Sequence, residues 1–194
     1  VMWGSDYLLG LSTFAPDAVL QLGSVPTSKT LAAWIDRVPT RVIVGPPGAW
    51  ADPGHGAHSV FLGDADHLLS ALANGFGPVT TSGQQWLDQW VDVERRVRGH
   101  LDSILDGSDE LSDGSIFEGR IARDVVAAPP DGSTLLVASS MPVRDVETFA
   151  APRRGLRVIA NRGANGIDGF VSTALGAATT TDGPTVALLG DLCL

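Results

Sequence analysis

The sequence lacks most of the features that mark secreted, membrane-bound or nucleic-acid-binding proteins. Its 194 residues include one cysteine, Cys193, which excludes an internal disulfide framework and fits a reducing compartment. No stretch approaches the roughly 18 consecutive apolar residues of a membrane-spanning helix, and the first residues lack the basic region of a signal peptide. We therefore predict a cytoplasmic protein with no membrane partner.

Basic residues are scarce as well. The chain has 13 lysines and arginines against 22 aspartates and glutamates, which gives a formal net charge of −9 at pH 7. Because phosphate binding needs a basic surface, this balance argues against a nucleic-acid partner. Hydrophobic residues make up 44% of the chain and charged residues 18%, a composition that suits a globular protein with one large domain or two small ones.

The first half of the chain alternates short apolar runs with amphipathic stretches. Strands are predicted at 18–23, 40–45 and 59–63, since each run is short and ends in glycine. Helices are predicted at 25–38, at 65–74 with Asp64 as the cap, and at 82–106. Strands that alternate with helices in this way pair in parallel, so this half is predicted to form a Rossmann-like α/β layer.

A second alternation follows an acidic, glycine-containing stretch near 107–114. Its strands are predicted at 134–139, 156–161 and 185–191, and its helices at 115–127, 142–150 and 169–180. The strands are apolar throughout, as in a doubly wound parallel sheet that is covered on both faces.

Unusual residues follow all three strands of the second half. The first strand is followed by SSMPVRD, the second by NRGANGIDG and the third by GDL. In an open α/β sheet, ligands bind outside the carboxyl ends of the strands. Each segment alone fits a connecting loop, but three at the same edge favour a binding site.

The segment SSMPVRD combines a helix start with a positive charge. Its serines precede Pro142, where a hydroxyl can cap the helix and free N–H groups can hold an anion. Arg144 lies one turn further on and can point back at the same anion. Alternatively, this is a capped helix on which Arg144 pairs with Asp145 or Glu147.

The other two segments add a second arginine and a carboxylate. Arg162 follows the second strand, and two guanidinium groups at neighbouring strand ends suggest a ligand with more than one carboxylate. Asp191 follows the third strand, where it is placed as an oxygen ligand for magnesium, although turn formation is the default explanation for this residue taken alone. No GxGxxG or P-loop motif follows any strand.

In order and spacing, these three motifs resemble the MenD family, the thiamine-diphosphate-dependent synthases of menaquinone biosynthesis. Residues 21–31, QLGSVPTSKTL, and 51–69, ADPGHGAHSVFLGDADHLL, resemble the middle domain of that family. The resemblance covers essentially the whole chain and implies a piece of a longer protein. Residues 1–110 would be the later part of a Rossmann-like middle domain, and 111–194 the first half of the diphosphate-binding domain.

The resemblance implies an enzyme, a transferase of the SEPHCHC synthase type. The implied reaction is decarboxylation of 2-oxoglutarate and conjugate addition of the resulting carbanion to isochorismate, giving SEPHCHC and CO2. The implied cofactors are thiamine diphosphate and Mg²⁺ (or Mn²⁺), and the implied assembly is a homodimer or homotetramer. Alternatives are another thiamine-diphosphate lyase, such as an oxoacid decarboxylase or acetolactate-type synthase, or a noncatalytic Rossmann-like module that binds an acidic ligand.

The resemblance also assigns residues of this chain to the site. The substrate-binding residues would be Ser140, Arg144 and Arg162. The cofactor-binding residues would be Asn165, Ile167, Gly190, Asp191, Leu192 and Cys193, with Asp191 also a metal ligand. Ile167 would be the apolar wedge under the thiazolium ring, while the Asn165 carbonyl and the Ile167 N–H would contact the aminopyrimidine ring. The activating glutamate would come from another domain, so no catalytic residue is assigned, and the isolated chain is expected to be inactive.

Two weaker patterns have plainer explanations. His55 and His58 form an HxxH pattern, but on a loop rich in glycine and proline, solvated histidines are a better explanation than a metal site. Arg95, Arg96 and Arg98 form a small basic cluster, which we interpret as a solvated helix face.

Overall fold

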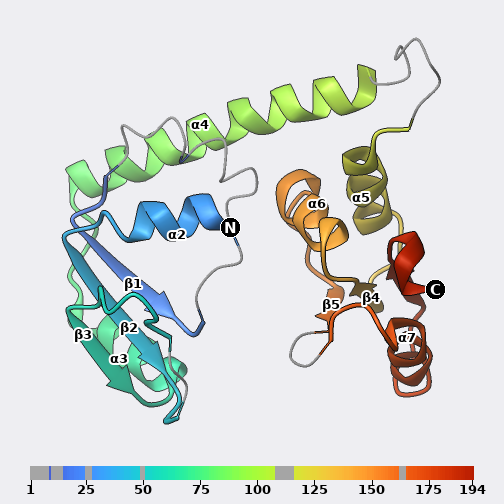
Figure 1. The fold of residues 1–194 in the computed structure, drawn as a ribbon. Coiled ribbons are helices and arrows are strands. Elements are labelled where there is room, and N and C mark those ends of the chain that lie inside the picture. Colours follow the sequence, from blue (N-terminus) through green and yellow to red (C-terminus); the bar gives the residue numbers. More distant parts are fainter. Residues whose placement is uncertain (1–8, 10–14, 25–27, 49–50, 108–115, 162–164) are drawn as a thin grey trace. The chain divides into compact units, whose positions relative to one another are not determined.

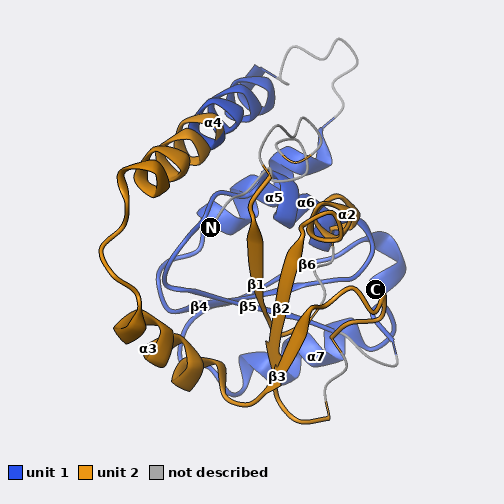
Figure 2. Cartoon of the chain, turned by 90° about the vertical axis from the view of Figure 1, so that its left-hand side faces the viewer, with its two compact units in different colours: residues 1–4, 94–194 blue, residues 5–93 orange. Residues whose placement is uncertain are grey.

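The computed structural model describes residues 9, 15–24, 28–48, 51–107, 116–161 and 165–194. The chain divides into two compact units, one of residues 5–93 and one of residues 94–194 together with 1–4 (Figure 2). The division falls inside helix α4 (Thr81–Asp106). The domain boundary predicted at 110/111 lies outside the described residues, and the predicted domains stay a prediction.

The unit of residues 5–93 is built on a parallel sheet. Its strands are β1 (Ala18–Leu22), β2 (Thr40–Gly45) and β3 (Ser59–Leu62), in the order β1-β2-β3 (Figure 1). Its helices are α2 (Lys29–Ile35), α3 (Ala65–Gly75) and the first half of α4. All three predicted strands and their parallel pairing are confirmed.

Side-chain caps start two of these helices. The Asp64 carboxylate accepts a hydrogen bond from the N–H of His67 at 3.0 Å, which confirms the predicted cap of α3. The Ser28 hydroxyl accepts one from the N–H of Leu31 at 3.0 Å. Helix α2 ends at Ile35, earlier than predicted. After it, Arg37 and Val38 donate to the carbonyl oxygens three residues back, as in a tightened last turn, and Pro39 disfavours helical backbone at Val38.

The unit of residues 94–194 holds the second sheet. Its strands are β4 (Ser133–Val137), β5 (Leu156–Ala160) and β6 (Thr185–Leu188), paired in parallel in the order β5-β4-β6. Its helices are the second half of α4, α5 (Glu118–Ala127), α6 (Met141–Phe149) and α7 (Phe170–Ala178), followed by the short 3-10 helix η2 (Asp191–Cys193).

The central strand β4 is buried on both faces. Leu135 and Val137 pack against α5 and α6, while Leu136 packs on the opposite face against Phe170 of α7 and Cys193 of η2. Alternate side chains of a strand point to opposite faces, so one strand contributes to both cores. Helices therefore cover both faces of this sheet, which confirms the predicted doubly wound arrangement.

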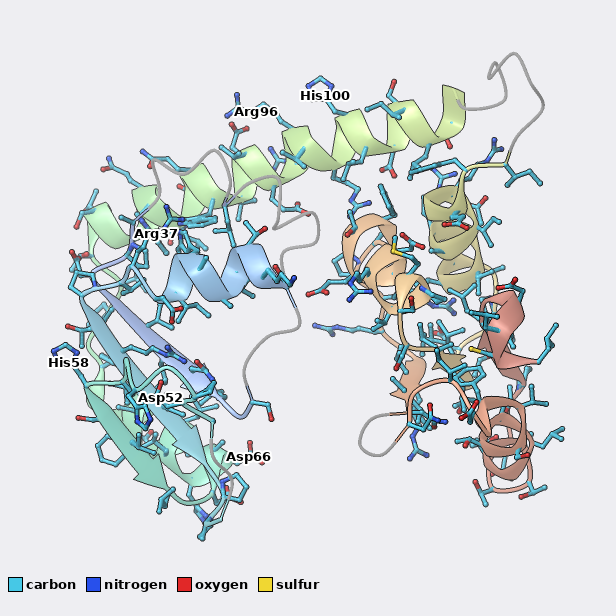
Figure 3. The ribbon with its side chains drawn as sticks, in the orientation of Figure 1. Arg37, Asp52, His58, Asp66, Arg96 and His100 are labelled. Carbon is cyan, nitrogen blue, oxygen red and sulfur yellow. The ribbon has the colours of Figure 1, made fainter. Side chains whose placement is uncertain are left out.

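Helix α6 is anchored at its carboxyl end by α4. The Arg98 guanidinium donates to the carbonyl oxygens of Phe149 and Ala150 at 2.8 and 3.2 Å. Arg96 and His100 point outward, on the other side of α4 from α6 (Figure 3). The predicted solvated face is therefore wrong for Arg98, because its charge satisfies carbonyl groups at a helix end.

Within the described ranges, no helix has both the length and the apolar character needed to cross a membrane.

Candidate functional site

A cavity of about 330 Å³ lies at the carboxyl edge of the β5-β4-β6 sheet. It is lined from the segment after β4, the turn before α7, the segment after β6, and the first turns of α5. The predicted site residues that line it are Ser140, Ile167, Gly190, Asp191, Leu192 and Cys193. Arg144 and Asn165 lie on two of the same segments but do not line it, and Arg162 lies outside the described residues.

Two of the three predicted segments are joined directly. The Ser139 hydroxyl donates to the carbonyl oxygen of Asn161 at 3.2 Å, and the Ser139 N–H donates to the carbonyl oxygen of Gly166 at 3.4 Å. A Cβ atom at Gly166 would overlap the Ser139 side chain. A glycine is therefore required at 166 by the close approach of the segment after β4.

Helix α6 starts at the cavity without a side-chain cap. Ser140 occupies the N-cap position with φ 75° and ψ −128°, and its hydroxyl makes no capping hydrogen bond. This conformation is strained for a residue other than glycine, and such strain is typical of functional sites. The predicted side-chain cap of this helix is wrong, since the N–H groups of the first turn are not satisfied by Ser140, and Pro142 has none to offer.

Arg144 folds back onto the same segment. Its Nη1 donates to the carbonyl oxygen of Ser140 at 2.7 Å, and its side chain is exposed. The predicted direction of Arg144, back towards the helix start, is the one found.

The turn before α7 is closed by Asn165. The Asn165 Oδ1 accepts from the N–H groups of Ile167 and Asp168 at 2.9 and 3.2 Å. Gly169, at φ 75°, then begins α7 in the left-handed region. Ile167 is half-buried, packs on the core around Phe170 and lines the cavity. The Ile167 N–H already donates to the Asn165 side chain. The predicted contact between this N–H and an aminopyrimidine ring would therefore require the hydrogen bond to Asn165 to break.

The segment after β6 presents one carboxylate. Asp191 is exposed, and its Oδ1 accepts from the N–H of Leu192 at 2.9 Å. Cys193 lines the cavity and is otherwise buried in the core around Leu136 and Phe170. In the part of the chain that the structure describes, no three histidine, cysteine, aspartate or glutamate residues are grouped to hold a metal ion, and this includes the HxxH pattern.

Sequence reasoning missed an acidic wall of the cavity. Asp145 and Glu118 both line it, and Asp145 is only 8% exposed. Burial raises the pKa of Asp145, the nearby Glu118 carboxylate raises it further, and Arg144 opposes both effects. Asp145 follows Met141 by four residues and so shares its helical face, a spacing that could have pointed to it.

Comparisons with known proteins give one consistent name. A relative from Bacillus velezensis is 40% identical over 91% of this chain, which is 30% of the relative. One from Halobacterium salinarum is 38% identical over 99% of this chain and 32% of its own length, and one from Myxococcus xanthus is 42% identical over 97% and 32%. Each is named 2-succinyl-5-enolpyruvyl-6-hydroxy-3-cyclohexene-1-carboxylate synthase. No family model matches the chain. The chain thus spans about a third of the curated relatives that it matches.

Proposed function

Because the chain belongs to the family of 2-succinyl-5-enolpyruvyl-6-hydroxy-3-cyclohexene-1-carboxylate synthases, we propose that the longer enzyme containing it acts in menaquinone biosynthesis. The proposed reaction joins 2-oxoglutarate, with loss of CO2, to isochorismate. One observation carries this proposal: segments that follow β4, β5 and β6 meet at one cavity, with Ser140, Ile167 and Asp191 on its wall. The names of the relatives favour this synthase over other thiamine-diphosphate lyases and over a noncatalytic module.

Two parts of the cavity wall suit thiamine diphosphate: the apolar surface of Ile167 and the segment after β6. Ile167 offers a half-buried apolar surface backed by Phe170, which suits the underside of a ring. Gly190 and the backbone of Leu192 and Cys193 would adjoin the diphosphate, and Asp191 would give one oxygen ligand to Mg²⁺. When bound, this cofactor supplies an electron sink for decarboxylation and carbon–carbon bond formation.

The chain's own residues would bind and orient the substrates. The Arg144 guanidinium has donors beyond the one on the Ser140 carbonyl, and a planar guanidinium suits a carboxylate. Ser140 contributes a hydroxyl at the cavity wall. Arg162 is assigned to a second carboxylate by the resemblance alone. The homo-oligomeric assembly and the cytoplasmic location also stay predictions.

The proposal is tested by assaying the longer enzyme with both substrates, thiamine diphosphate and Mg²⁺, and identifying the product by mass spectrometry. Arg144→Gln should raise KM for the carboxylate substrates by roughly tenfold or more, the effect of losing about 1.5–3 kcal/mol of charged hydrogen bonding. Arg154→Gln, at an exposed arginine in the loop before β5, serves as the matched control. Turnover of a 2-oxoacid with an uncharged acceptor, and none with isochorismate, would favour the decarboxylase or acetolactate-type alternative.

A further inference from the structure

The cavity carries more negative charge than an anion-binding site would be expected to have. Its charged lining residues are Glu118, Asp145 and Asp191, and among the described residues no basic side chain lines it. The substrates and the diphosphate of the proposed function are all anions. An ionised Asp145 would therefore oppose their binding at this wall.

Asp145 stands out because it is a largely buried aspartate whose carboxyl group has no protein partner. The residue is only 8% exposed and lines the cavity, and no hydrogen bond or ion pair to its carboxyl group is found among the residues that the structure describes. Its oxygens are not among the enclosed side-chain atoms without a hydrogen-bond partner in the described part of the chain, so they keep access to the cavity. Asp52 in the other unit shows the usual arrangement of a buried aspartate: its carboxylate accepts from the N–H groups of Gly56 and Ala57 at 3.1 and 2.9 Å. A buried carboxyl group without such donors is costly when ionised.

The start of α6 supplies the complementary half of an anion site. This nine-residue helix begins at Met141 with no side-chain cap on its first-turn N–H groups, and Met141 and Pro142 line the cavity beside Asp145. Free N–H groups and the helix dipole favour an anion at this position. A neutral Asp145 could add one O–H donor to the same anion.

Building on the proposed function, we infer that Asp145 binds an anionic oxygen of the ligand as a neutral acid, so that binding is accompanied by uptake of one proton at this residue. The anionic oxygen belongs to a substrate carboxylate or to the cofactor diphosphate. Asp145 thereby becomes a specificity-determining residue, since its proton is needed before an anion can occupy this wall.

The surroundings of Asp145 support the inference. Burial raises the pKa of Asp145 and Glu118 raises it further, while Arg144 lowers it less strongly. The other titratable groups that line the cavity are Asp191 and Cys193 of η2, and neither is a cation that would stabilise ionised Asp145. An arriving anion would raise the pKa of Asp145 again. Affinity should therefore be highest below that pKa and fall by up to about tenfold per pH unit above it.

Calorimetry on the longer enzyme measures this proton directly. Titrations in buffers of different ionisation enthalpy, between about pH 6 and about pH 8, give the number of protons taken up per ligand bound. Inorganic pyrophosphate represents the diphosphate, and glutarate represents a substrate dicarboxylate. The wild-type enzyme should take up more protons than Asp145→Asn with one of these probes, and that probe identifies the source of the anionic oxygen. The difference between the two proteins cancels the protons that belong to the probe itself.

Two further variants keep the experiment decisive. Asp182→Asn, at an exposed aspartate on the loop before β6, should match the wild type. Glu118→Gln should move the pH dependence of binding to lower pH, because it removes the carboxylate that raises the pKa of Asp145. That shift can be measured even if Asp145→Asn folds poorly.

The outcomes separate this inference from the proposed function. Equal proton uptake by wild type and Asp145→Asn, or no binding of either probe to the wild type, would overturn the role of Asp145. If product still forms from 2-oxoglutarate and isochorismate, the proposed function stands without it. If excess proton uptake is measured but no product forms, Asp145 holds an anion and the proposed reaction is wrong.

Discussion

The Ser139 hydroxyl donates a hydrogen bond to the backbone carbonyl of Asn161, 22 residues further along the chain, at 3.2 Å. This contact joins the loop after β4 to the loop after β5, the two neighbouring strand ends at which the arginines were predicted. The N–H of Ser139 also donates a hydrogen bond to the carbonyl oxygen of Gly166. The relative position of Ser140 and Ile167 at the cavity therefore depends on how closely these loops approach.

Gly166→Ala should separate the two loops. The added methyl group would overlap the Ser139 side chain, and overpacking of this kind typically costs about 1–3 kcal/mol of unfolding free energy. Denaturant unfolding measures this cost, and thiamine diphosphate affinity should fall with it. Ser139→Gly in the same protein should restore part of the loss, because it removes the overlapping atoms.

Gly176→Ala is the matched control for Gly166. Gly176 lies inside α7 with open space where a Cβ would stand. Alanine is the better helix former there, so this variant should be stabilised by about 0.5–1 kcal/mol. Equal effects at 166 and 176 would mean that contact with Ser139 does not explain the glycine.

The elements were predictable because local patterns agree with the fold. Each of the six strands was recognised as a short, mostly apolar run, and β4 needs such a sequence because helices cover both of its faces. The meeting of Ser140, Ile167 and Asp191 at one cavity could also be predicted from the strand ends alone, because parallel strands share a carboxyl edge.

What could not be predicted depends on contacts between distant residues. Arg98 was assigned to solvent because its neighbours in sequence are charged, and nothing local shows that α6 ends beside it. Asp145 was considered only as a partner for Arg144, because burial at a cavity wall is decided by α5 and η2. The positive φ of Ser140 and the missing side-chain cap could not be predicted either, since serine at this position normally caps a helix.

Ile167→Ala should weaken cofactor binding. Truncation removes apolar surface at the cavity while leaving the Asn165 turn, because that turn uses the backbone N–H of residue 167 and not its side chain. A loss of about 1.4 kcal/mol corresponds to a tenfold rise in the thiamine diphosphate Kd. Ile104→Ala, at an exposed position of α4, should leave the Kd unchanged. An unchanged Kd for Ile167→Ala would refute the wedge assignment.

Arg98→Ala should destabilise the unit of residues 94–194. It removes two charge-assisted hydrogen bonds to carbonyls at the end of α6, and each such bond contributes about 1.5–3 kcal/mol. His100→Ala, at an exposed position on the outer side of α4, should change the unfolding free energy by no more than about 0.5 kcal/mol. Thermal unfolding of both variants measures the difference, and equal stabilities would show that the Arg98 contacts contribute nothing.

Asp52 should make the stability of the unit of residues 5–93 depend on acid pH. Hydrogen bonds from the N–H groups of Ala57 and Gly56 and the positive charge of Arg41 lower its pKa, against a smaller opposing effect of burial. A carboxyl group whose pKa is lowered in the folded state stabilises the protein fully at pH values above its ordinary pKa, which is near 3.8. This contribution is lost as the pH falls through the folded-state pKa. Asp52→Asn should therefore be less stable than the wild type at neutral pH, and the difference in unfolding free energy should narrow in acid.

Fluorescence of Trp34, Trp86 and Trp90, which all lie in this unit, can follow denaturant unfolding at each pH. Asp17→Asn, at an exposed aspartate before β1, should show the wild-type pH profile. A gap that stays constant from neutral pH to acid would show that the ionised carboxylate of Asp52 is not what holds the loop.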